Sequence, residues 1–292
     1  MRRVLVFGAS GQVGHAVRAL APADTAVLAP ASAEVDLRDA AAVRRAVRDA
    51  RPSAVVNCAA FTRVDDAEAE PAAAHAVNAD APGAMAEAAA ALGARLVHVS
   101  TDYVFGGAGD PPFGPGAPTN PLGAYGASKL AGERRVLAAD PGAAVVRTAW
   151  VHSGGGANFV RTAARLLAEG RTMHVVDDQV STPTRALHLA EALWALAGRR
   201  DVRGVLHVTD AGVASWYDVA ACVLDTLRDE GAAPGSAAVF PVDSSAHPRA
   251  ARRPRVSLLD KHAAWRALGL TPVHWRAGVA ASTREHLRAS PA

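Results

Sequence analysis

A tyrosine and a lysine four residues apart form the pair in this sequence best suited to acid–base chemistry. Tyr125 and Lys129 lie in the segment AYGASKLAGE, and their spacing places both on one face of a helix. A phenol has a pKa of about 10, and a nearby ammonium stabilises the phenolate, so the pair can serve proton transfer near neutral pH. An accidental surface pair is the alternative. The chain has two lysines, Lys129 and Lys261, so chance places a lysine four residues after one of three tyrosines in only about 2% of such chains.

A second group of polar residues directly follows an apolar run. Residues 96–99 are typical of a buried strand, and the chain continues as STDYVFGG from Ser100 to Gly107. A capped strand end that enters a loop is one explanation. The other is a reaction centre, in which the Thr101 hydroxyl binds the same carbonyl oxygen that Tyr125 protonates.

A glycine-rich loop near the start of the chain predicts a dinucleotide site. The stretch GASGQVG places Gly8, Gly11 and Gly14 between an expected strand at 4–7 and a helix that runs to about residue 20. The first glycine permits a tight turn, the second lets a pyrophosphate approach the backbone, and the third lets helix and strand pack. The helix N-terminus adds free N–H groups for the phosphates. A tight turn without a ligand is the alternative.

The identity of the dinucleotide depends on the residues after the second strand. That strand ends near Leu28, and no acid comes directly after it to bind a ribose hydroxyl. Asp36 stands several residues later, and Arg38 is the nearest arginine. The missing acid favours NADPH, with NADH as the alternative.

Short β-rich runs alternate with helical patterns, which predicts a parallel sheet with helices on both faces. The expected strands are 4–7, 25–28, 54–58, 95–100, 144–148 and 205–208, and the further expected helices are 40–49, 72–92 with Pro82 as a candidate kink, 125–138 and 187–196. The fold class is α/β, a doubly wound parallel Rossmann sheet with a smaller C-terminal substrate-binding domain. We expect 1–150 plus about 184–210 to form the dinucleotide-binding domain, and about 151–183 plus 211–292 to form the substrate domain.

Composition narrows the class of protein. Half of the 292 residues are hydrophobic and 20% are charged, which is typical of a globular chain with a sizeable core. Much of the arginine excess lies in PRAARRPR, residues 248–255, which indicates a solvated face, or else an anionic-substrate site; nucleic acid is a distant third. Cys58 and Cys222 have no metal-binding spacing, and no apolar run is long enough to span a membrane. We therefore expect a cytoplasmic protein with no metal, no membrane partner and no nucleic-acid partner.

Seven stretches, spread over nearly the whole chain, carry a family resemblance. They are VNCAAFTRVDDAEAEP, STDYVFGG, YGASKLAGE, RTAWVHSGGGANFV, VVDDQVSTPT, SWYDVA and ARRPRVSLLD. In this order the sequence resembles the dTDP-4-dehydrorhamnose reductases, a family of the extended short-chain dehydrogenase/reductase superfamily.

The resemblance implies a role for a set of residues. Catalysis would fall to Thr101, Tyr125 and Lys129. The dinucleotide would be bound by Gly8, Ser10, Gly11, Gln12, Val13, Gly14, Asp36, Leu37, Cys58, Ala59 and Ala60, together with Tyr125 and Lys129. The sugar nucleotide would lie against Thr62, Val64, Thr101, Tyr103, Tyr125, Trp150 and Arg253, the last of these near its diphosphate. Taken alone, Trp150 is explained equally well as a core aromatic residue.

The residue after Asp102 separates two reactions of the superfamily. In the pattern of the 4,6-dehydratases, Thr-Asp is followed by a Glu that removes the C5 proton, whereas this chain has Tyr103. The resemblance therefore implies a ketoreductase. It would reduce the C4 keto group of a dTDP-4-keto-6-deoxyhexose, first of all dTDP-4-dehydro-L-rhamnose, as a monomer or a homodimer.

Four departures from the family pattern leave the particular sugar open. Ser181 stands where Gly is usual, His152 stands where Tyr is common, and the loop at 113–118 lacks the usual acids. Ala16 replaces a carboxylate that some members use in a metal-linked dimer, so we expect no metal. The alternatives are a 4-ketoreductase for another deoxysugar, such as a dihydrostreptose type, a non-catalytic regulatory subunit of the same fold, or an epimerase.

Overall fold

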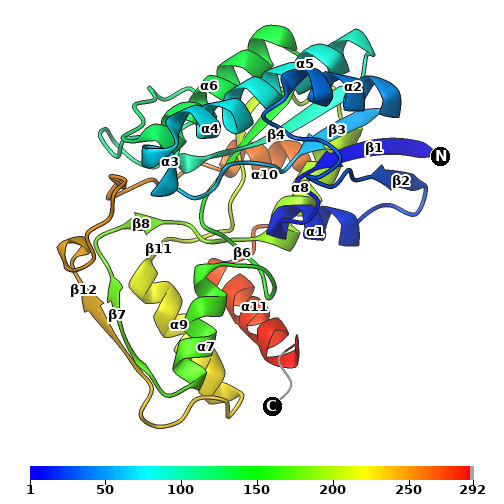
Figure 1. Cartoon of the computed structure of the whole chain (residues 1–292). Coiled ribbons are helices and arrows are strands. Elements are labelled where there is room, and N and C mark those ends of the chain that lie inside the picture. Colours follow the sequence, from blue (N-terminus) through cyan, green and yellow to red (C-terminus); the bar gives the residue numbers. More distant parts are fainter. Residues whose placement is uncertain (290–292) are drawn as a thin grey trace.

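The computed structural model describes residues 1–289 and is built around a six-stranded sheet (Figure 1). The strands are all parallel, in the order β10-β5-β4-β3-β1-β2. Their bounds are β1 (Arg2–Phe7), β2 (Thr25–Leu28), β3 (Ala54–Asn57), β4 (Arg95–Thr101), β5 (Ala144–Thr148) and β10 (Gly204–His207). The predicted fold class is confirmed, and each strand agrees with its expected range to within two residues.

The strand order changes direction between β1 and β3. In a doubly wound sheet, ligands bind outside the carboxyl ends of the strands at such a switch point. β1 ends at Phe7, just before the glycine loop, and β3 ends at Asn57, just before Cys58. The topology therefore brings these two loops to the place where a dinucleotide site is expected.

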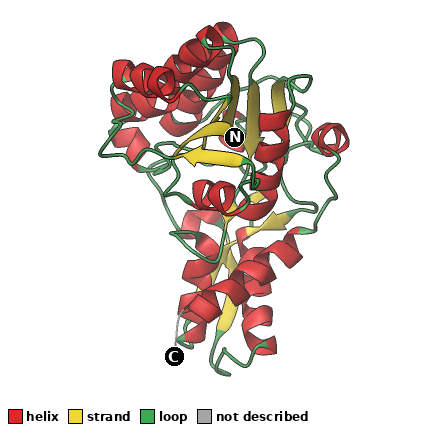
Figure 2. Ribbon diagram, turned by 90° about the vertical axis from the view of Figure 1, so that its right-hand side faces the viewer, coloured by secondary structure: helices red, strands yellow, loops and turns green. Residues whose placement is uncertain are grey.

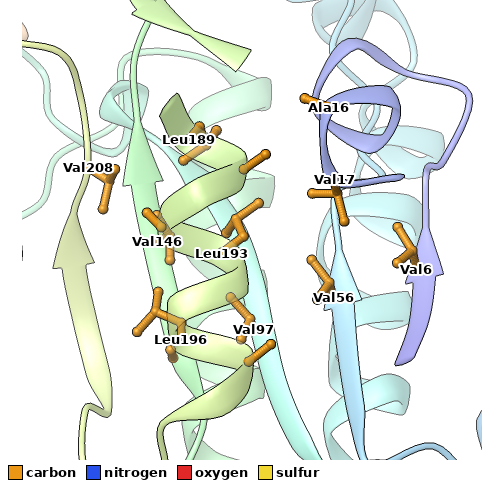
Figure 3. Packing of buried hydrophobic residues seen from close by; sticks show 14 of the residues in the cluster. Val6, Ala16, Val17, Val56, Val97, Val146, Leu189, Leu193, Leu196 and Val208 are labelled. Atoms are coloured by element: carbon orange, nitrogen blue, oxygen red, sulfur yellow. The ribbon is translucent and has the colours of Figure 1, made fainter. Parts of the chain in front are cut away.

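Helices cover both faces of the sheet. One face carries α1 (Gln12–Ala19) and α8 (Ala186–Gly198), and the other carries α2 (Ala40–Ala50), α5 (Ala81–Ala91) and α6 (Ala124–Ala139). Side chains alternate along a strand, so the run Val4–Phe7 supplies Val4 and Val6 to the first core and Leu5 and Phe7 to the second. Figure 3 shows the first core, with Leu189, Leu193 and Leu196 of α8 among the strand valines.

The helix expected at 72–92 is divided into three parts. α4 (Pro71–His75) is followed by a π-helical segment, Ala76–Asp80, and then by α5. Pro82 has no N–H to bond four residues back, and the wider π turn accommodates this within the helix. The Asn78 side chain in this segment bonds both backbone groups of Phe61 and the Ser128 hydroxyl, which ties the helix to the loop after β3 and to α6.

The later part of the chain forms a second group of elements below the carboxyl end of the sheet (Figures 1 and 2). Three helices pack around a separate apolar cluster: α7 (Phe159–Ala168), α9 (Trp216–Asp229) and α11 (Trp275–Ala289). Short strand pairs accompany them: β6 (Val151–His152) with β9 (Thr184–Arg185), β7 (Thr172–Val176) with β12 (Ala238–Val242), and β8 (Val180–Ser181) with β11 (Ala214–Ser215). By contrast, α10 (His262–Leu268) lies against β10 and α8, and Ala264 joins the core of the sheet.

Short elements and one long loop complete the chain. α3 (Asp66–Ala69) and the 3-10 turns Asp102–Val104 and Ser244–Ala246 are the short elements. The loop 106–123 holds no helix or strand, but Phe113 fixes it by stacking on Phe105 at 4.6 Å between ring centroids. No helix within residues 1–289 is both long and apolar enough to cross a membrane.

Candidate active site

A cavity of about 690 Å³ opens at the carboxyl ends of the central strands. This volume falls in the range of small-molecule and cofactor sites. Its wall includes most of the residues that the sequence assigned to a site: Gly8, Ser10, Gly11, Gln12, Val13, Leu37, Cys58, Ala59, Ala60, Thr62, Thr101, Tyr125, Lys129 and Trp150. Residues far apart in the chain therefore meet at one place, with the glycine loop and the Tyr–Lys pair lining the same space.

Three of the predicted residues, Gly14, Asp36 and Val64, do not line the cavity. Gly14 packs α1 on β1, because a Cβ there would collide with the Gly8 carbonyl and lie 2.5 Å from the Ala9 Cα. Asp36 is half-exposed and pairs with Arg38 at 2.8 Å, and this pairing lowers the pKa of Asp36 to about 2. Val64 lies beside the cavity, in a small hollow next to Tyr125.

Tyr103 and Arg253 also lie outside the main cavity. Tyr103 shares the small hollow with Val64, and its ring meets that of Tyr125 edge to face at 5.8 Å. Arg253 makes a two-pronged ion pair with Asp65, at 3.1 and 2.9 Å. The guanidinium expected at a substrate diphosphate is thus engaged by a carboxylate 188 positions earlier in the chain.

The glycine loop has the geometry that a bound pyrophosphate requires. Gly8 has φ +75°, and a Cβ there would lie 2.5 Å from the Ala59 amide, so only glycine fits. Gly11 is the N-cap of α1 and supplies no side chain to bond the free N–H groups of that helix. These N–H groups and the helix dipole are available for an anion in the cavity.

Gln12 joins the glycine loop to the second group of elements. Its Oε1 accepts hydrogen bonds from the Ser153 hydroxyl and the Asn158 amide, each at 2.9 Å. The segment from Gly156 to Phe159 lines the same cavity. The cavity therefore has walls from both parts of the molecule.

The Tyr125–Lys129 pair stands at the start of α6. Gly123 is the N-cap and has no side chain, so the Glu68 carboxylate accepts the Ala124 N–H instead, at 2.8 Å. Lys129 is buried, and its Nζ donates to the Val99 carbonyl at 2.7 Å. The helix thus fixes both Tyr125 and Lys129 against the end of β4.

Burial dominates the ionisation of this pair. It raises the pKa of Tyr125 to about 12, against the opposing hydrogen bond with Thr101. It also lowers the pKa of Lys129 to about 8, against the opposing charge of Glu133. In this state Tyr125 is a protonated phenol at neutral pH, which is the form that donates a proton. Acidification of Tyr125 by Lys129 during the reaction stays a prediction.

Thr101 ends β4 in an extended conformation at the floor of the cavity. Its hydroxyl accepts the Tyr103 N–H at 3.2 Å and donates to Asp102 Oδ1 at 3.1 Å. Asp102 is buried, lines the cavity and accepts hydrogen bonds from Ser257 and Ser181, at 2.5 and 3.4 Å. Burial raises the pKa of Asp102 to about 6. The sequence places this carboxylate beside Thr101 but indicates no role for it.

An aromatic platform forms the far wall. Trp150 has φ +46° and stacks on Trp216, with ring centroids 3.7 Å apart and planes 11° apart. Phe159 meets Trp216 edge to face at 5.0 Å. Trp150 is therefore a cavity residue in a left-handed conformation. Trp216 and Phe159 were missed, although Trp216 lies in the quoted stretch SWYDVA.

His152 and Ser181, the two departures nearest the site, are both buried. His152 lines the cavity, its Nδ1 bonds the Ser282 hydroxyl at 3.0 Å, and burial lowers its pKa to about 3, so the ring is neutral. Ser181 donates its hydroxyl to Asp102 and to the Ser257 carbonyl. Within residues 1–289, no group of three or more His, Cys, Asp and Glu side chains could hold a metal ion.

A parallel sheet with a glycine loop after its first strand and a Tyr-x-x-x-Lys helix at the same edge defines a protein of the short-chain dehydrogenase/reductase type. The family model described as "RmlD substrate binding domain" matches residues 1–288. The chain belongs to this family, that of the dTDP-4-dehydrorhamnose reductases, as its motifs led us to predict.

Individual relatives agree with this assignment. A dTDP-4-dehydrorhamnose reductase of Streptomyces griseus is 46% identical over 288 residues, covering 96% of this chain and 92% of the relative. A dTDP-4-keto-6-deoxy-D-glucose reductase of Streptomyces niveus is 42% identical over 94% of this chain and 93% of its own length. The crystal structure of dTDP-4-dehydrorhamnose reductase from Bacillus anthracis in complex with NADP is 31% identical and covers 96% of this chain and 98% of that one, with a TM-score of 0.87.

Proposed function

We propose that this protein is an NADPH-dependent ketoreductase that reduces the C4 keto group of a dTDP-4-keto-6-deoxyhexose, foremost dTDP-4-dehydro-L-rhamnose. One observation carries the proposal: Thr101, Tyr125 and Lys129 converge on the cavity that the glycine loop also lines. Position 103, which would hold the base of a dehydratase, holds a tyrosine outside that cavity. The relatives named for this reaction support the same assignment.

The residues present fit a nicotinamide dinucleotide. A Cβ at Gly11 would contact nothing closer than the Gly8 carbonyl at 3.4 Å, so the backbone there is open to the cavity, and α1 points its uncapped N-terminus toward the same space. Gly8, Ser10, Gly11, Gln12 and Val13 would hold the pyrophosphate, and Leu37 and the loop 58–60 would hold the adenosine and nicotinamide halves. Asp36 and Arg38 would meet the ribose at the edge. When bound, the reduced nicotinamide supplies the hydride.

The chain's own residues would handle the carbonyl oxygen. Thr101 orients the ketone through its hydroxyl, which Asp102 holds in place at 3.1 Å. Tyr125 gives its proton to the oxygen as the alkoxide forms. Lys129 compensates the charge left on the phenolate, and it would hold the ribose hydroxyls of a bound dinucleotide. Exclusion of water from the cavity by the bound molecules would strengthen each of these interactions.

The sugar nucleotide would lie on the opposite side of the cavity. Thr62 and Trp150 line it directly, and we assign Val64, Tyr103 and Arg253 to its border. Apart from α10, which packs on the sheet, the two structural groups support the predicted division into a dinucleotide domain and a substrate domain. We further propose a cytoplasmic monomer or homodimer, since Cys58 and Cys222 are free thiols of the kind found in reducing compartments.

A second candidate substrate is another dTDP-4-keto-deoxysugar. The 42% identical relative named for 4-keto-6-deoxy-D-glucose supports it, as do His152 and Ser181, which differ from the usual residues at the cavity and beside Asp102. Both candidates share the same reaction at C4.

A substrate panel tests the proposal. NADPH oxidation is followed with dTDP-4-dehydro-L-rhamnose, prepared enzymatically, and with dTDP-4-keto-6-deoxy-D-glucose. We expect the former to give the higher kcat/KM. Preference for the latter would select the second candidate. Tight dinucleotide binding with no oxidation by any 4-keto sugar would reject the ketoreductase and favour an epimerase. Absence of both binding and turnover would favour the regulatory subunit.

A further inference from the structure

Three buried charged side chains lie where α6 packs against β4 and β5: Lys129 lines the cavity, and Glu133 and Arg147 lie outside its wall. Lys129 and Glu133 follow each other at i, i+4 on α6, on the face that also carries Tyr125, and Arg147 comes from β5. They are 2%, 2% and 4% exposed, respectively. Groups buried this deeply keep their charge only if other charges and hydrogen bonds compensate for the lost water.

Glu133 is held at a fixed position by two strands. Arg147 donates two hydrogen bonds to its carboxylate, from Nε to Oε1 at 2.9 Å and from Nη2 to Oε2 at 2.7 Å. Ser100, next to the catalytic Thr101, donates its hydroxyl to Oε1 at 2.6 Å. Because β4 and β5 both hold it, the carboxylate cannot move relative to the catalytic end of the sheet.

Three titratable groups around this cluster, Cys58, His98 and His207, carry no charge at neutral pH. Burial raises the pKa of Cys58 to about 12 and holds the pKa of His98 well below its usual value; the His98 ring pairs with Asn57 at 3.0 Å. Burial also lowers the pKa of His207, beside Arg147, to about 4. In all, the other titratable groups that face this cluster are Cys58, His98, Asp102, Tyr103, Tyr125 and His207. Asp102 acts on Tyr125 rather than on Lys129, so among the described residues the charge that acts on Lys129 is that of Glu133, which Arg147 pairs.

We propose that Glu133 is a positioning residue for the proton transfer: its fixed carboxylate keeps the Lys129 ammonium charged and leaves the Lys129–Glu133–Arg147 cluster with one net positive charge. That charge is neutralised when Tyr125 becomes a phenolate. The inference rests on the proposed function for its purpose, but the charge relation can be measured without any substrate.

A purely structural Glu133–Arg147 pair makes a different prediction. If the pair only joins α6 to β5, changing its charges alters the stability of the fold and leaves the protonation of Lys129 where it was. If Glu133 holds the charge on Lys129, the two members of the pair act in opposite directions. Loss of Glu133 leaves two uncompensated cations, whereas loss of Arg147 frees the carboxylate to act on Lys129 alone.

The two lysines of the chain make the experiment direct. In protein grown with ¹³C,¹⁵N-lysine, Lys129 and Lys261 give two side-chain signals, and Lys261→Arg assigns them. The pH titration of the Lys129 signal is recorded for the dinucleotide-free wild type, Glu133→Gln, Arg147→Gln and the double variant. Glu87→Gln, which breaks a pair with Arg44 near the surface, is the matched control.

We expect Glu133→Gln to lower the Lys129 midpoint by about one pH unit or more, since a close opposite charge shifts a pKa by this amount. Arg147→Gln should raise it, and Glu87→Gln and the Lys261 signal should not move. If Glu133→Gln alone does not fold, the double variant, which carries no unpaired partner, should still lower the midpoint by a smaller amount. An unchanged Lys129 midpoint in Glu133→Gln or in the double variant would overturn the proposal.

The pH dependence of kcat then distinguishes a failure of this inference from a failure of the proposed function. With an active 4-keto sugar, the high-pH limb of kcat should move down in Glu133→Gln by the same interval as the Lys129 midpoint. If the midpoint moves but the limb does not, Glu133 sets a charge that the reaction does not use, and the proposal fails. A wild type that turns over no 4-keto sugar removes the proposed function while the titration still decides the charge relation.

Discussion

Both lysines of this chain are buried and have a lowered pKa, but their neighbours differ. Lys129 is 2% exposed and Lys261 is 7% exposed, and burial lowers the pKa of each to about 8. Lys129 lines the large cavity next to Tyr125 and donates to the Val99 carbonyl. Lys261 donates to the Thr182 hydroxyl at 3.0 Å and the Gly212 carbonyl at 3.3 Å, over the ring of Trp265.

A perturbed pKa therefore does not distinguish the lysine proposed for catalysis from the other lysine. What differs is the neighbour: Lys129 stands beside a phenol at a cavity, whereas Lys261 joins the loop around Thr182 to Gly212. Lysine suits both positions, because a compact ammonium can direct its three donors at close backbone carbonyls.

Replacing each lysine in turn tests most directly whether the two differ in function. We expect Lys129→Met to lower kcat about 10²–10³-fold, because the forming phenolate loses its compensating charge. Lys261→Met should lower the free energy of unfolding by about 1–3 kcal/mol through lost hydrogen bonds and keep kcat within a few fold. Steady-state kinetics and urea unfolding of both variants provide the check. Equal losses of kcat would show that the two regions do not differ in function.

Asp102 extends the comparison to a buried acid, whose pKa shifts upward. Its value rises from 3.8 to about 6, so the fold favours the protonated form. The associated stability is complete below about pH 4 and is lost as the pH rises through 6, an effect of about 3 kcal/mol at most. We expect Asp102→Asn to remove this loss, so that the variant gains stability relative to wild type between pH 4 and 7.

Unfolding curves across this pH range test the expectation. The difference in unfolding free energy between Asp102→Asn and wild type should grow with pH. A constant difference would mean that Asp102 is already ionised in the folded protein throughout, held so by its three hydroxyl donors, Thr101, Ser181 and Ser257.

The smallest effect is expected at the exposed rim. Arg38 is held against Asp36 by three side-chain hydrogen bonds, between 2.8 and 3.1 Å. Arg38→Ala should raise the KM for NADPH several-fold and leave the KM for NADH nearly unchanged, because a guanidinium recognises phosphate but is not needed for a hydroxyl. Equal changes in both KM values would mean that Arg38 does not contribute to the choice between NADPH and NADH.

The fold was predictable from the sequence where local patterns decide the structure. The strands Thr25–Leu28 and Ala144–Thr148 match their predicted ranges, and α6 begins within one residue of its predicted start. Valine-rich runs between helical patterns are sufficient for this, because both faces of the sheet are covered. The glycine loop and the Tyr–Lys pair could also be recognised from the sequence, since each is a short motif within its expected strand or helix.

The features that the sequence did not reveal depend on contacts between distant residues. The π segment at 76–80 lies just before Pro82 and contains Asn78, whose side chain bonds Phe61 and Ser128. The cap of α6 comes from Glu68, 56 positions earlier, and Asp65 engages Arg253. No local pattern records such pairings, so the border of the substrate site was the least predictable part.

In the proposed reaction, Tyr125 protonates a C4 carbonyl while the sugar receives a hydride from the dinucleotide. The most direct test of this reaction uses NADPH deuterated at the transferring position of the nicotinamide, with dTDP-4-dehydro-L-rhamnose and with Tyr125→Phe as the matched variant. We predict that the wild type yields a sugar with deuterium at C4, and that Tyr125→Phe still binds NADPH but forms this product about 10²–10⁴-fold more slowly. Deuterium at C4 formed at an equal rate by Tyr125→Phe, or a wild type that binds both molecules and transfers none, would contradict the account.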